Sequence, residues 1–479
     1  MRDDLDALRR RMDSVTTEMM LLLLDRMEIA KKIGHIKREA GRDVTDEERE
    51  EQLRRNVLRL CRERVQKYDG SDAGVDGNGR QPHPATAEQV AARFLNFLLN
   101  ESNRIQSAPT AGPTHLSVFQ RAKRLEMSGR RIIHMEVGEP DFMPPEEVKH
   151  ALAGSYDAGH VRYGEPRGMP ELLDALAARA SAKFGSEVLP GHIMVSPGGR
   201  FAIFAAMSAL LRPGDEVVIM EPAWPAYRNC AMRAGAKVRA VRTCLEDSWT
   251  PSTSSMREMI NPSTRMIILN YPNNPTGRVL PLHVMDEVME MASEGGLYVL
   301  ADEIYSEYTK KPWRSVISYH YDRGISVQSF SKSHAMTGLR IGYAIANSRP
   351  IIDRMASLSA LCLTSVSAPI QYAALRALDA DTSQNATAMS ERLGILERTA
   401  RGMGLEFVPP DGGMYIFARM RGTDGASFVE RMLEGKGVAL APGTGFGGAY
   451  RDFIRISACL DTESLTEGMN RLKSMLNEG

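Results

Sequence analysis

The chain has 479 residues, more than one hydrophobic core usually holds, so two or more domains are expected. Hydrophobic residues make up 43% and charged residues 25%, as in an ordinary soluble protein, and Lys plus Arg balance Asp plus Glu at 60 each. This balance excludes a chain-wide attraction to nucleic acid or anionic membrane, and no apolar run is long enough to span a bilayer.

Five cysteines are scattered along the chain without paired spacing, which favours reduced thiols over a disulfide framework. The opening stretch MRDDLDALRR lacks the apolar core of a secretion signal. We therefore expect a cytoplasmic protein without membrane or nucleic-acid partners and without a bound metal.

The first long segment, to about Arg38, is predicted to be one helix with an apolar stripe whose steps alternate between three and four residues. Arg26 occupies a position in that stripe where an apolar residue is expected. A guanidinium keeps its charge, so burying it is unfavourable by several kcal/mol unless an anion meets it. Lys37 lies eleven residues later, about three turns, and points in nearly the same direction. The two cations indicate a pocket for an anion.

Two further helices are predicted in the first 106 residues, separated by a loop rich in Gly, Asp and Pro at 69–85. The polar side chains that these helices direct toward the same interior are Asp46, Arg49, Glu50, Ser102 and Gln106. The 106 residues carry 20 basic and 20 acidic side chains, and this balance argues against a DNA-binding arm.

Over residues 5–106 this set resembles the all-helical (type II) chorismate mutases. The resemblance implies a chorismate mutase domain at 1–106, followed by a linker at 107–114. Such an enzyme rearranges chorismate to prephenate without a nucleophile, by folding the substrate and stabilising charge on the breaking ether oxygen. The positions that match the family's active site are Arg9, Arg26, Lys37, Asp46, Arg49, Glu50, Ser102 and Gln106.

The resemblance also implies a role for each of these residues. Arg26, together with the partner subunit's Arg9, would hold the two carboxylates of chorismate. Lys37 and Gln106 would donate hydrogen bonds to the ether oxygen, and Glu50 would accept one from the ring hydroxyl. The other three matched residues would be polar neighbours that support the carboxylate cluster. In an alternative reading, these helices form a regulatory or dimerisation module that binds an aromatic ligand without turnover.

From His115 onward, short β-rich segments alternate with helical ones, which predicts an α/β domain with a mostly parallel sheet. The expected strands are HIMVS, EVVIM, MIILNY, LYVLAD, ISVQSF and IGYAIA. After about Asp379 the elements become mainly helical, with MYIFARM and DFIRIS as strands, which predicts a smaller α+β domain. The expected fold is therefore multidomain: an all-α three-helix domain followed by an α/β domain at 115–479 with its smaller companion.

Lys332 follows a predicted strand in the stretch SFSKSHAMTGLRIGY. A single loop lysine is usually a solvated surface charge. Here YPNNPTG, ADEIY and SPGGR also follow predicted strands, at the carboxyl ends where open α/β sheets bind ligands. In this order, and with EVGEPDF, YGEPRGMPEL and a late RIS, the motifs resemble the fold-type I, class I pyridoxal-phosphate aminotransferases of the aspartate, aromatic and prephenate subgroup.

This second resemblance implies pyridoxal 5′-phosphate as the cofactor. Lys332 would bind the cofactor aldehyde covalently and then move the substrate proton. Asp302 would pair with the pyridinium nitrogen, and Trp224 would stack on the ring. Tyr305 and Asn274 would hydrogen-bond the 3′ oxygen of the ring.

The phosphate would be held by Ser329, Arg340, the backbone at Gly199 and Arg200, and Tyr163 of the partner subunit. The last of these contacts implies a homodimer. Arg455 would form a bidentate pair with the substrate α-carboxylate, and Gly138 would line the substrate side. Where aspartate-preferring members often have a lysine, this chain has Arg200, so Arg200 is a candidate for binding a second substrate carboxylate; the alternative is a surface arginine at a helix start.

Together the two resemblances predict a bifunctional enzyme of aromatic amino acid biosynthesis, an isomerase joined to a transferase. Prephenate is an α-keto acid with a second carboxylate, so the aminotransferase would be able to convert it to arogenate, with glutamate or aspartate as amino donor. Arylpyruvates, or aspartate and oxaloacetate alone, fit the same site. A transcription regulator built on an aminotransferase-like domain is disfavoured, because the first 106 residues supply no basic reader helix.

Overall fold

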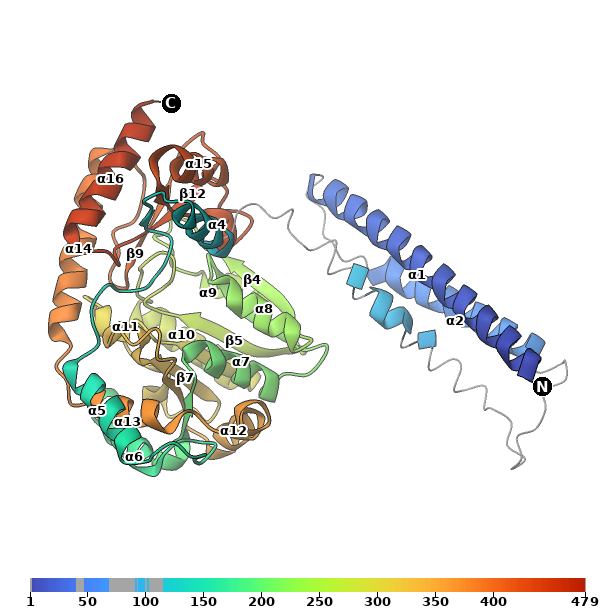
Figure 1. Cartoon of the computed structure of the whole chain (residues 1–479), viewed down its shortest axis with the longest axis horizontal. Coiled ribbons are helices and arrows are strands. Elements are labelled where there is room, and N and C mark those ends of the chain that lie inside the picture. The colour runs from blue at the N-terminus through green and yellow to red at the C-terminus, as the bar shows by residue number, and fades with distance from the viewer. Residues whose placement is uncertain are drawn as a thin grey trace. The chain divides into compact units, whose positions relative to one another are not determined.

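The computed structural model describes residues 2–39, 47–68, 91–92, 94–99, 101–102 and 115–478. The chain divides into two compact units, Met1–Gly112 and Pro113–Gly479, and each is described by itself. The first unit is helical in its described residues, and the second combines helices with strands (Figure 1). None of the described helices is long and apolar enough to cross a membrane.

Two long helices, α1 (Arg2–Glu39) and α2 (Glu47–Tyr68), make up most of the described first unit. A third helical segment lies within 91–102, and Arg54 of α2 donates a hydrogen bond of 2.6 Å from Nη1 to Asn96 Oδ1 in that segment. Ala30, Leu95 and Leu99 are buried apolar residues of this unit. The predicted start of α2 near Thr45 and the loop at 69–85 lie outside the described residues.

Helix α1 carries apolar side chains on two faces. Its inner face contains the buried Ala30 and the half-buried Arg26 and Lys37, spaced as expected for side chains that point the same way. Much of the predicted apolar stripe is instead exposed in the single chain: Leu8, Met12, Val15, Met19, Leu22, Ile29, Ile33 and Ile36. The inner face and the exposed apolar face lie next to each other around the helix. Arg26 is therefore on the inner face, although many residues of its predicted stripe are exposed.

A seven-stranded mixed sheet forms the centre of the second unit, with strand order β2-β8-β7-β6-β5-β3-β4. Neighbouring strands are parallel except at β8, which is antiparallel to both β2 and β7. The strands are β2 (Ile193–Ser196), β3 (Glu216–Glu221), β4 (Lys237–Arg242), β5 (Thr264–Asn270), β6 (Tyr298–Asp302), β7 (Gly324–Ser329) and β8 (Gly342–Ala346). Six of them coincide with the predicted strands, and the edge strand β4 was not predicted.

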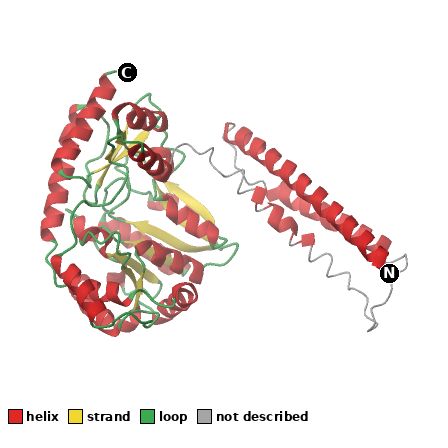
Figure 2. Ribbon diagram, in the orientation of Figure 1, coloured by secondary structure: helices red, strands yellow, loops and turns green. Residues whose placement is uncertain are grey.

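Helices cover both faces of this sheet, as the ribbon in Figure 2 shows. One face packs against α5 (Glu146–Asp157), α6 (Pro170–Phe184), α9 (Thr253–Met259), α10 (Leu282–Gly295) and α13 (Ala368–Ala377). The other face packs against α7 (Gly199–Leu210), α8 (Pro225–Arg233) and α12 (Arg349–Leu363). Burial on both faces explains why the inner strands read as continuous apolar runs in the sequence.

A smaller α+β part has its own core. It contains the parallel pair β1 (Ile133–His134) and β10 (Val438–Ala439), and an antiparallel sheet of β11 (Ala441–Pro442), β12 (Phe453–Ser457) and β9 (Tyr415–Arg419). Its helices are α4 (His115–Met127), α14 (Ser383–Gly402), α15 (Gly425–Arg431) and α16 (Thr462–Asn477). The predicted fold class, a helical unit followed by an α/β unit with a smaller α+β companion, is confirmed.

Candidate active sites

A cavity of 500 Å³ in the second unit collects most of the residues predicted for the aminotransferase site. The predicted residues that line it are Gly138, Gly199, Arg200, Trp224, Asn274, Asp302, Tyr305, Ser329, Lys332, Arg340 and Arg455. Asp302 and Ser329 are the last residues of β6 and β7, and Gly199 is the first residue of α7, which follows β2. The site therefore lies at the carboxyl ends of these strands, where open α/β sheets bind ligands. Tyr163 does not line this cavity, and its side chain is 88% exposed.

Asp302 is the buried carboxylate of the cavity, with only 1% of its surface exposed. Tyr227 Oη donates a hydrogen bond of 2.6 Å to Asp302 Oδ2, and the main-chain N–H of Ile304 donates one of 3.4 Å to Oδ1. Burial raises the pKa of Asp302 to about 6, and the bond from Tyr227 acts in the opposite direction. A carboxylate held in this way is suited to a cationic ring nitrogen.

Lys332 lies in the short helix α11 (Phe330–Ser333), directly after β7. Its Nζ donates a hydrogen bond to the carbonyl oxygen of Gly138, and Tyr308 Oη donates one of 2.7 Å to the carbonyl oxygen of Lys332. Desolvation lowers the pKa of the Lys332 amine. A lowered pKa increases the fraction of neutral amine, which is the nucleophilic form.

One corner of the cavity is built to receive an anion. The amino end of α7 begins at Gly199, and Ser329 and Arg340 line the same cavity. Gly198, the residue before α7, has φ 86°, and a Cβ there would lie 2.7 Å from Arg340 Nη2. Glycine at this position therefore allows the guanidinium to approach the helix end, which is a favourable place for phosphate.

Arg455 in β12 is 3% exposed and lies between two aromatic rings. Its guanidinium carbon is 4.2 Å from the ring centre of Tyr415 and 5.0 Å from that of Phe446. Arg455 Nη1 donates a hydrogen bond of 2.8 Å to Asn274 Oδ1, and Nη2 donates one to the carbonyl oxygen of Glu136. Arg455 Nε is buried and has no hydrogen-bond partner among the described residues. A buried guanidinium with a spare donor and no carboxylate pair is suited to an anionic ligand.

Arg200 also lines the cavity, but its side chain is exposed. Its guanidinium carbon lies 4.8 Å from the ring centre of Trp224, at cation–π distance. Trp224 in turn contacts Tyr227 edge to face, with ring centres 5.5 Å apart. Besides Arg340 near the amino end of α7, the cavity thus contains two further arginines: Arg455, fixed beside aromatic rings, and Arg200, at an exposed position.

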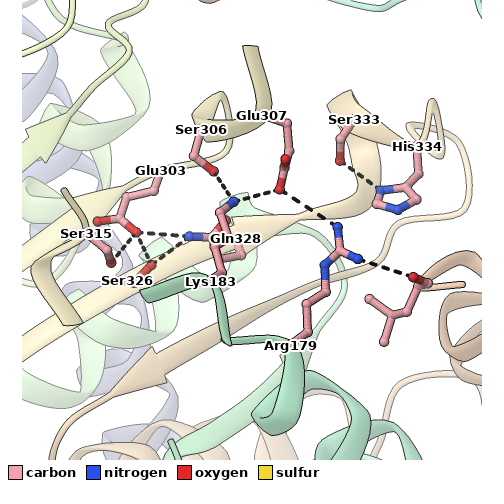
Figure 3. A network of polar contacts seen from close by, with 11 residues as sticks. Arg179, Lys183, Glu303, Ser306, Glu307, Ser315, Ser326, Gln328, Ser333 and His334 are labelled. Atoms are coloured by element: carbon pink, nitrogen blue, oxygen red, sulfur yellow. Dashed lines mark hydrogen bonds and ion pairs between the residues drawn. The ribbon is translucent and has the colours of Figure 1, made fainter. Parts of the chain in front are cut away.

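Two groups of polar contacts lie next to the site (Figure 3): one connects the ends of β6 and β7, and the other connects the segment after β6 to helix α6. Glu303 is buried, and its Oε2 accepts hydrogen bonds from Ser315, Ser326 and Gln328 at 2.9, 2.5 and 3.0 Å. Lys183 of α6 lies 2.6 Å from Glu307 and donates a hydrogen bond of 2.9 Å to Ser306. Ser326 and Gln328 belong to β7, so Glu303 connects the ends of β6 and β7.

Three residues important to this geometry were not predicted. They are Tyr227, which bonds Asp302, Tyr415, whose Oη lies 3.1 Å from Tyr305 Oη, and Glu136, whose carbonyl meets Arg455. Tyr227 lies one helical turn after Trp224 in EPAWPAY, and that spacing is a sequence clue that was available. The other two contacts join segments far apart in the chain and have no local pattern.

The predicted mutase residues fall in the first unit. Arg26 and Lys37 share the inner face of α1, Arg49 and Glu50 lie near the start of α2, and Ser102 is buried in the third segment. Arg26 Nε is buried without a hydrogen-bond partner among the described residues, and Ser102 Oγ donates to the carbonyl oxygen of Leu98 at 2.7 Å. Asp46, Gln106 and the side chain of Arg9 lie outside the described part.

Comparison with known proteins agrees with this architecture. The family model "Aminotransferase class I and II" matches residues 130–472, and "Chorismate mutase type II" matches residues 8–107. An aspartate aminotransferase of Thermotoga maritima is 34% identical over 78% of this chain and 99% of its own length. An aspartate/prephenate aminotransferase of Thermus thermophilus is 33% identical over 78% of this chain and 98% of its own length.

The similarity extends to solved structures. The crystal structure of aspartate aminotransferase from Thermotoga maritima gives a TM-score of 0.74 at 33% identity, covering 78% of this chain and 99% of the other. Aspartate aminotransferase from Thermus thermophilus with maleate gives 0.73 at 32% identity, covering 76% of this chain and 96% of the other. The chain therefore belongs to the class I and II aminotransferases, which use pyridoxal 5′-phosphate, and carries a type II chorismate mutase domain ahead of the aminotransferase, so it is both an isomerase and a transferase.

Proposed function

We propose that the two domains catalyse consecutive steps: rearrangement of chorismate to prephenate, and transamination of prephenate to arogenate with glutamate or aspartate as amino donor. The observation that carries the second step is the pair of arginines, Arg455 and Arg200, in one cavity. Prephenate has an α-keto carboxylate and a second carboxylate, and each arginine is suited to one of them. The Thermus relative that is named for prephenate supports this substrate.

The residues of the cavity fit the cofactor, and we propose these roles for them. Pyridoxal 5′-phosphate supplies an electron sink next to the substrate α-carbon when bound. Asp302 would keep the ring nitrogen protonated, because its carboxylate is buried and already accepts a hydrogen bond. Lys332 would attach to the aldehyde carbon and then carry the substrate proton. Trp224 would cover one ring face.

Further residues of the cavity would orient the ligand. Tyr305 and Asn274 would hold the 3′ oxygen, and Asn274 also bonds Arg455 at 2.8 Å, so cofactor and substrate sites share one amide. The amino end of α7 at Gly199, with Ser329 and Arg340, would bind the phosphate. Gly138 would line the substrate side, and glycine at this position lets the Tyr415 hydroxyl approach the main chain, because a Cβ here would overlap that hydroxyl.

In the first unit, we propose that Arg26 binds a carboxylate of chorismate and that Lys37 donates to the ether oxygen. Both side chains lie on the inner face of α1, and the spare Nε of Arg26 leaves a donor for an anion. Glu50 would accept a hydrogen bond from the ring hydroxyl, and Arg49 and Ser102 would be polar neighbours of the carboxylate cluster. The proposed domain boundaries remain 1–106 for the mutase, 107–114 for the linker and 115–479 for the aminotransferase.

We further propose that the working enzyme is a homodimer in the cytoplasm. The exposed apolar residues of α1 and the 88% exposed Tyr163 are suited to contacts with a second chain. Arg9 and Tyr163 of the partner subunit would then complete the mutase and phosphate sites. All five cysteines are free, which fits a reducing compartment.

The test is to give the purified, cofactor-loaded protein prephenate with glutamate or aspartate, and to quantify arogenate against a parallel phenylpyruvate reaction. Efficient arogenate formation supports consecutive steps. Phenylalanine formation without arogenate would identify an arylpyruvate aminotransferase and overturn the proposal. A second candidate, an aspartate aminotransferase with a mutase-like module that binds without turnover, is favoured by the names of several relatives. Measured consumption of chorismate would exclude it.

Arg200→Ala tests the second carboxylate site directly. We expect kcat/KM for prephenate and aspartate to fall about 10- to 100-fold, the effect of losing one charge-assisted pair, while phenylpyruvate is much less affected. Arg233→Ala is the matched control, because Arg233 is exposed at the end of α8 and does not line the cavity. Equal losses for mono- and dicarboxylic substrates would contradict the role of Arg200.

A further inference from the structure

A charged cluster behind the substrate arginine is not used by any of the roles above. His134 of β1 lies between two carboxylates: Nδ1 is hydrogen-bonded to Glu136 Oε1 at 2.8 Å, whereas Nε2 lies 3.1 Å from Glu126 Oε1, at ion-pair distance but without hydrogen-bond geometry. Glu136 is 1% exposed, and its Oε2 has no hydrogen-bond partner among the described residues. Glu126 belongs to α4, where Lys123 Nζ lies 2.8 Å from its Oε2.

The main chain of the same segment contacts both cations of the active site. The carbonyl oxygen of Glu136 accepts from Arg455, and that of Gly138 accepts from Lys332. Between β1 and these contacts, the carbonyl oxygen of Met135 accepts a hydrogen bond of 2.9 Å from the N–H of Ser457, two residues after Arg455. A small displacement of residues 135–138 would therefore move the acceptors of Arg455 and Lys332 together.

The protonation state of His134 decides how well this segment is held. A neutral imidazole donates one hydrogen bond and carries no charge, whereas the protonated ring donates to Glu136 and its positive charge also attracts Glu126 at ion-pair distance. The hydrogen bond with Glu136 is the largest cause that raises the pKa of His134 above its ordinary value; burial opposes it, and Glu126 adds to it. When the pH rises through this raised pKa, the ring loses its charge, and Glu136 is left as a buried carboxylate beside a neutral partner.

Among the described residues, two carboxylates act most strongly on His134. The groups that face it are Glu136 on its own strand, Glu126 with Lys123 on α4, and the ring of Phe119, whose centre lies 5.9 Å away. The neighbouring strand β10 places Ala439 opposite it. The two carboxylates thus dominate the electrostatics at the ring.

We propose that His134 is a positioning residue for Arg455. Its interactions with Glu126 and Glu136 fix the main-chain segment whose carbonyl oxygens accept hydrogen bonds from Arg455 and Lys332. His134 thereby sets the affinity of Arg455 for the substrate carboxylate. The inference rests on the proposed role of Arg455. It predicts that carboxylate binding weakens as the pH rises through the pKa of His134, which lies above the ordinary value of histidine, because the ring then loses its charge.

The test compares wild type with His134→Asn, which keeps a polar side chain but never carries a charge. The binding measurement is the dissociation constant of maleate, a dicarboxylate that is not transaminated, followed through the absorbance of the holoenzyme between pH 6 and pH 9. At pH 6 we expect the variant to bind maleate about fivefold more weakly, the effect of weakening one hydrogen bond. Toward pH 9 the difference between the two proteins should diminish, because wild-type His134 loses its charge as the pH rises through its raised pKa.

In steady-state kinetics with glutamate, KM of His134→Asn relative to wild type should change with pH in the same way as the dissociation constant of maleate. The value of kcat should change much less. Glu136→Gln is the second variant, because it preserves the shape and the carbonyl oxygen while removing the need for a charged ring. The dissociation constant of maleate for Glu136→Gln, divided by that for wild type, should also change with pH. The control is His150→Asn: His150 lies 3.6 Å from Glu146 on the exposed side of α5, away from the cavity, and this variant should match wild type at every pH.

The outcomes separate this inference from the role of Arg455. If Arg455→Lys weakens maleate binding but the ratios for His134→Asn and Glu136→Gln do not change with pH, the positioning role of His134 is refuted. If Arg455→Lys leaves maleate binding unchanged, the proposed carboxylate site itself is wrong. Equal loss of kcat and of folded protein in both variants would show a purely structural role and would also overturn the inference.

Discussion

Replacing Tyr227 by phenylalanine removes a single hydroxyl group and leaves a ring of the same shape. That hydroxyl donates a hydrogen bond of 2.6 Å to Asp302, and both side chains are buried. In its absence, the remaining bond to the Asp302 side chain is the long one, 3.4 Å, from the N–H of Ile304. Burial already raises the pKa of Asp302 to about 6, and the bond from Tyr227 opposes that shift. The variant should therefore have a higher Asp302 pKa than the wild type.

The size of the effect follows from the kind of bond that is lost. A hydrogen bond to a buried charged group contributes about 1.5–3 kcal/mol, which corresponds to about a 10- to 150-fold change in rate if the charged form is needed in the transition state. We expect kcat of the aminotransferase to fall within this range. The loss should be larger at lower pH, because Asp302 in the variant becomes protonated first as the pH falls.

Two measurements check this prediction. The absorbance of the bound cofactor, titrated with pH, should shift relative to wild type, and kcat should fall without a loss of chorismate mutase activity. Tyr321→Phe is the control: its hydroxyl donates to the carbonyl oxygens of Ala292 and Leu297, and the residue does not line the cavity. A Tyr227→Phe enzyme with wild-type kcat and an unshifted titration would refute the reasoning.

Three further changes probe other parts of the molecule. Lys37→Ala should slow chorismate consumption about 100- to 1000-fold, the effect of losing one transition-state donor, and leave transamination intact; two activity assays on one sample check this. Gly138→Ala should reduce transamination about 100-fold, because the added methyl group displaces the Tyr415 hydroxyl, and the absorbance spectrum should show that the cofactor still binds. Burial raises the pKa of Glu303 to about 7, so its contribution to stability is full below about pH 4.5 and is lost as the pH rises toward 7. Glu303→Gln should remove about 3 kcal/mol of this pH dependence from the free energy of unfolding, measured by urea denaturation.

Most of the sheet was predictable from the sequence, because strands buried on both faces are continuous apolar runs bounded by polar turns. The strand that was missed, β4, is at the edge of the sheet, and its sequence KVRAVR alternates charged with apolar residues. The antiparallel direction of β8 was also not predictable, since it depends on a crossover and not on composition. Local pattern therefore specified which segments are strands, and long-range pairing specified their order and direction.

The candidate site likewise contains residues that local motifs predict and residues whose long-range contacts they do not predict. Residues at the ends of strands, such as Asp302, Ser329 and Lys332, were predicted because each stands in a recognisable local motif. Tyr415 and Glu136 were missed because their functional contacts, with Tyr305 and Arg455, connect segments more than a hundred residues apart. Such contacts leave no trace in a single sequence unless the residue type is itself unusual for its surroundings.

Two arginines, one in each unit, illustrate that exception. Arg26 interrupts the apolar stripe of a helix, and Arg455 stands between two isoleucines in the strand FIRIS. In both cases Nε is buried without a hydrogen-bond partner among the described residues. Because a guanidinium does not lose its proton, a spare buried donor of this kind is suited to an anion, and this is the basis of the carboxylate-binding roles that we propose for both residues. Prephenate retains both carboxylates of chorismate, so the product of the first unit carries the groups that Arg455 and Arg200 in the second unit are suited to bind.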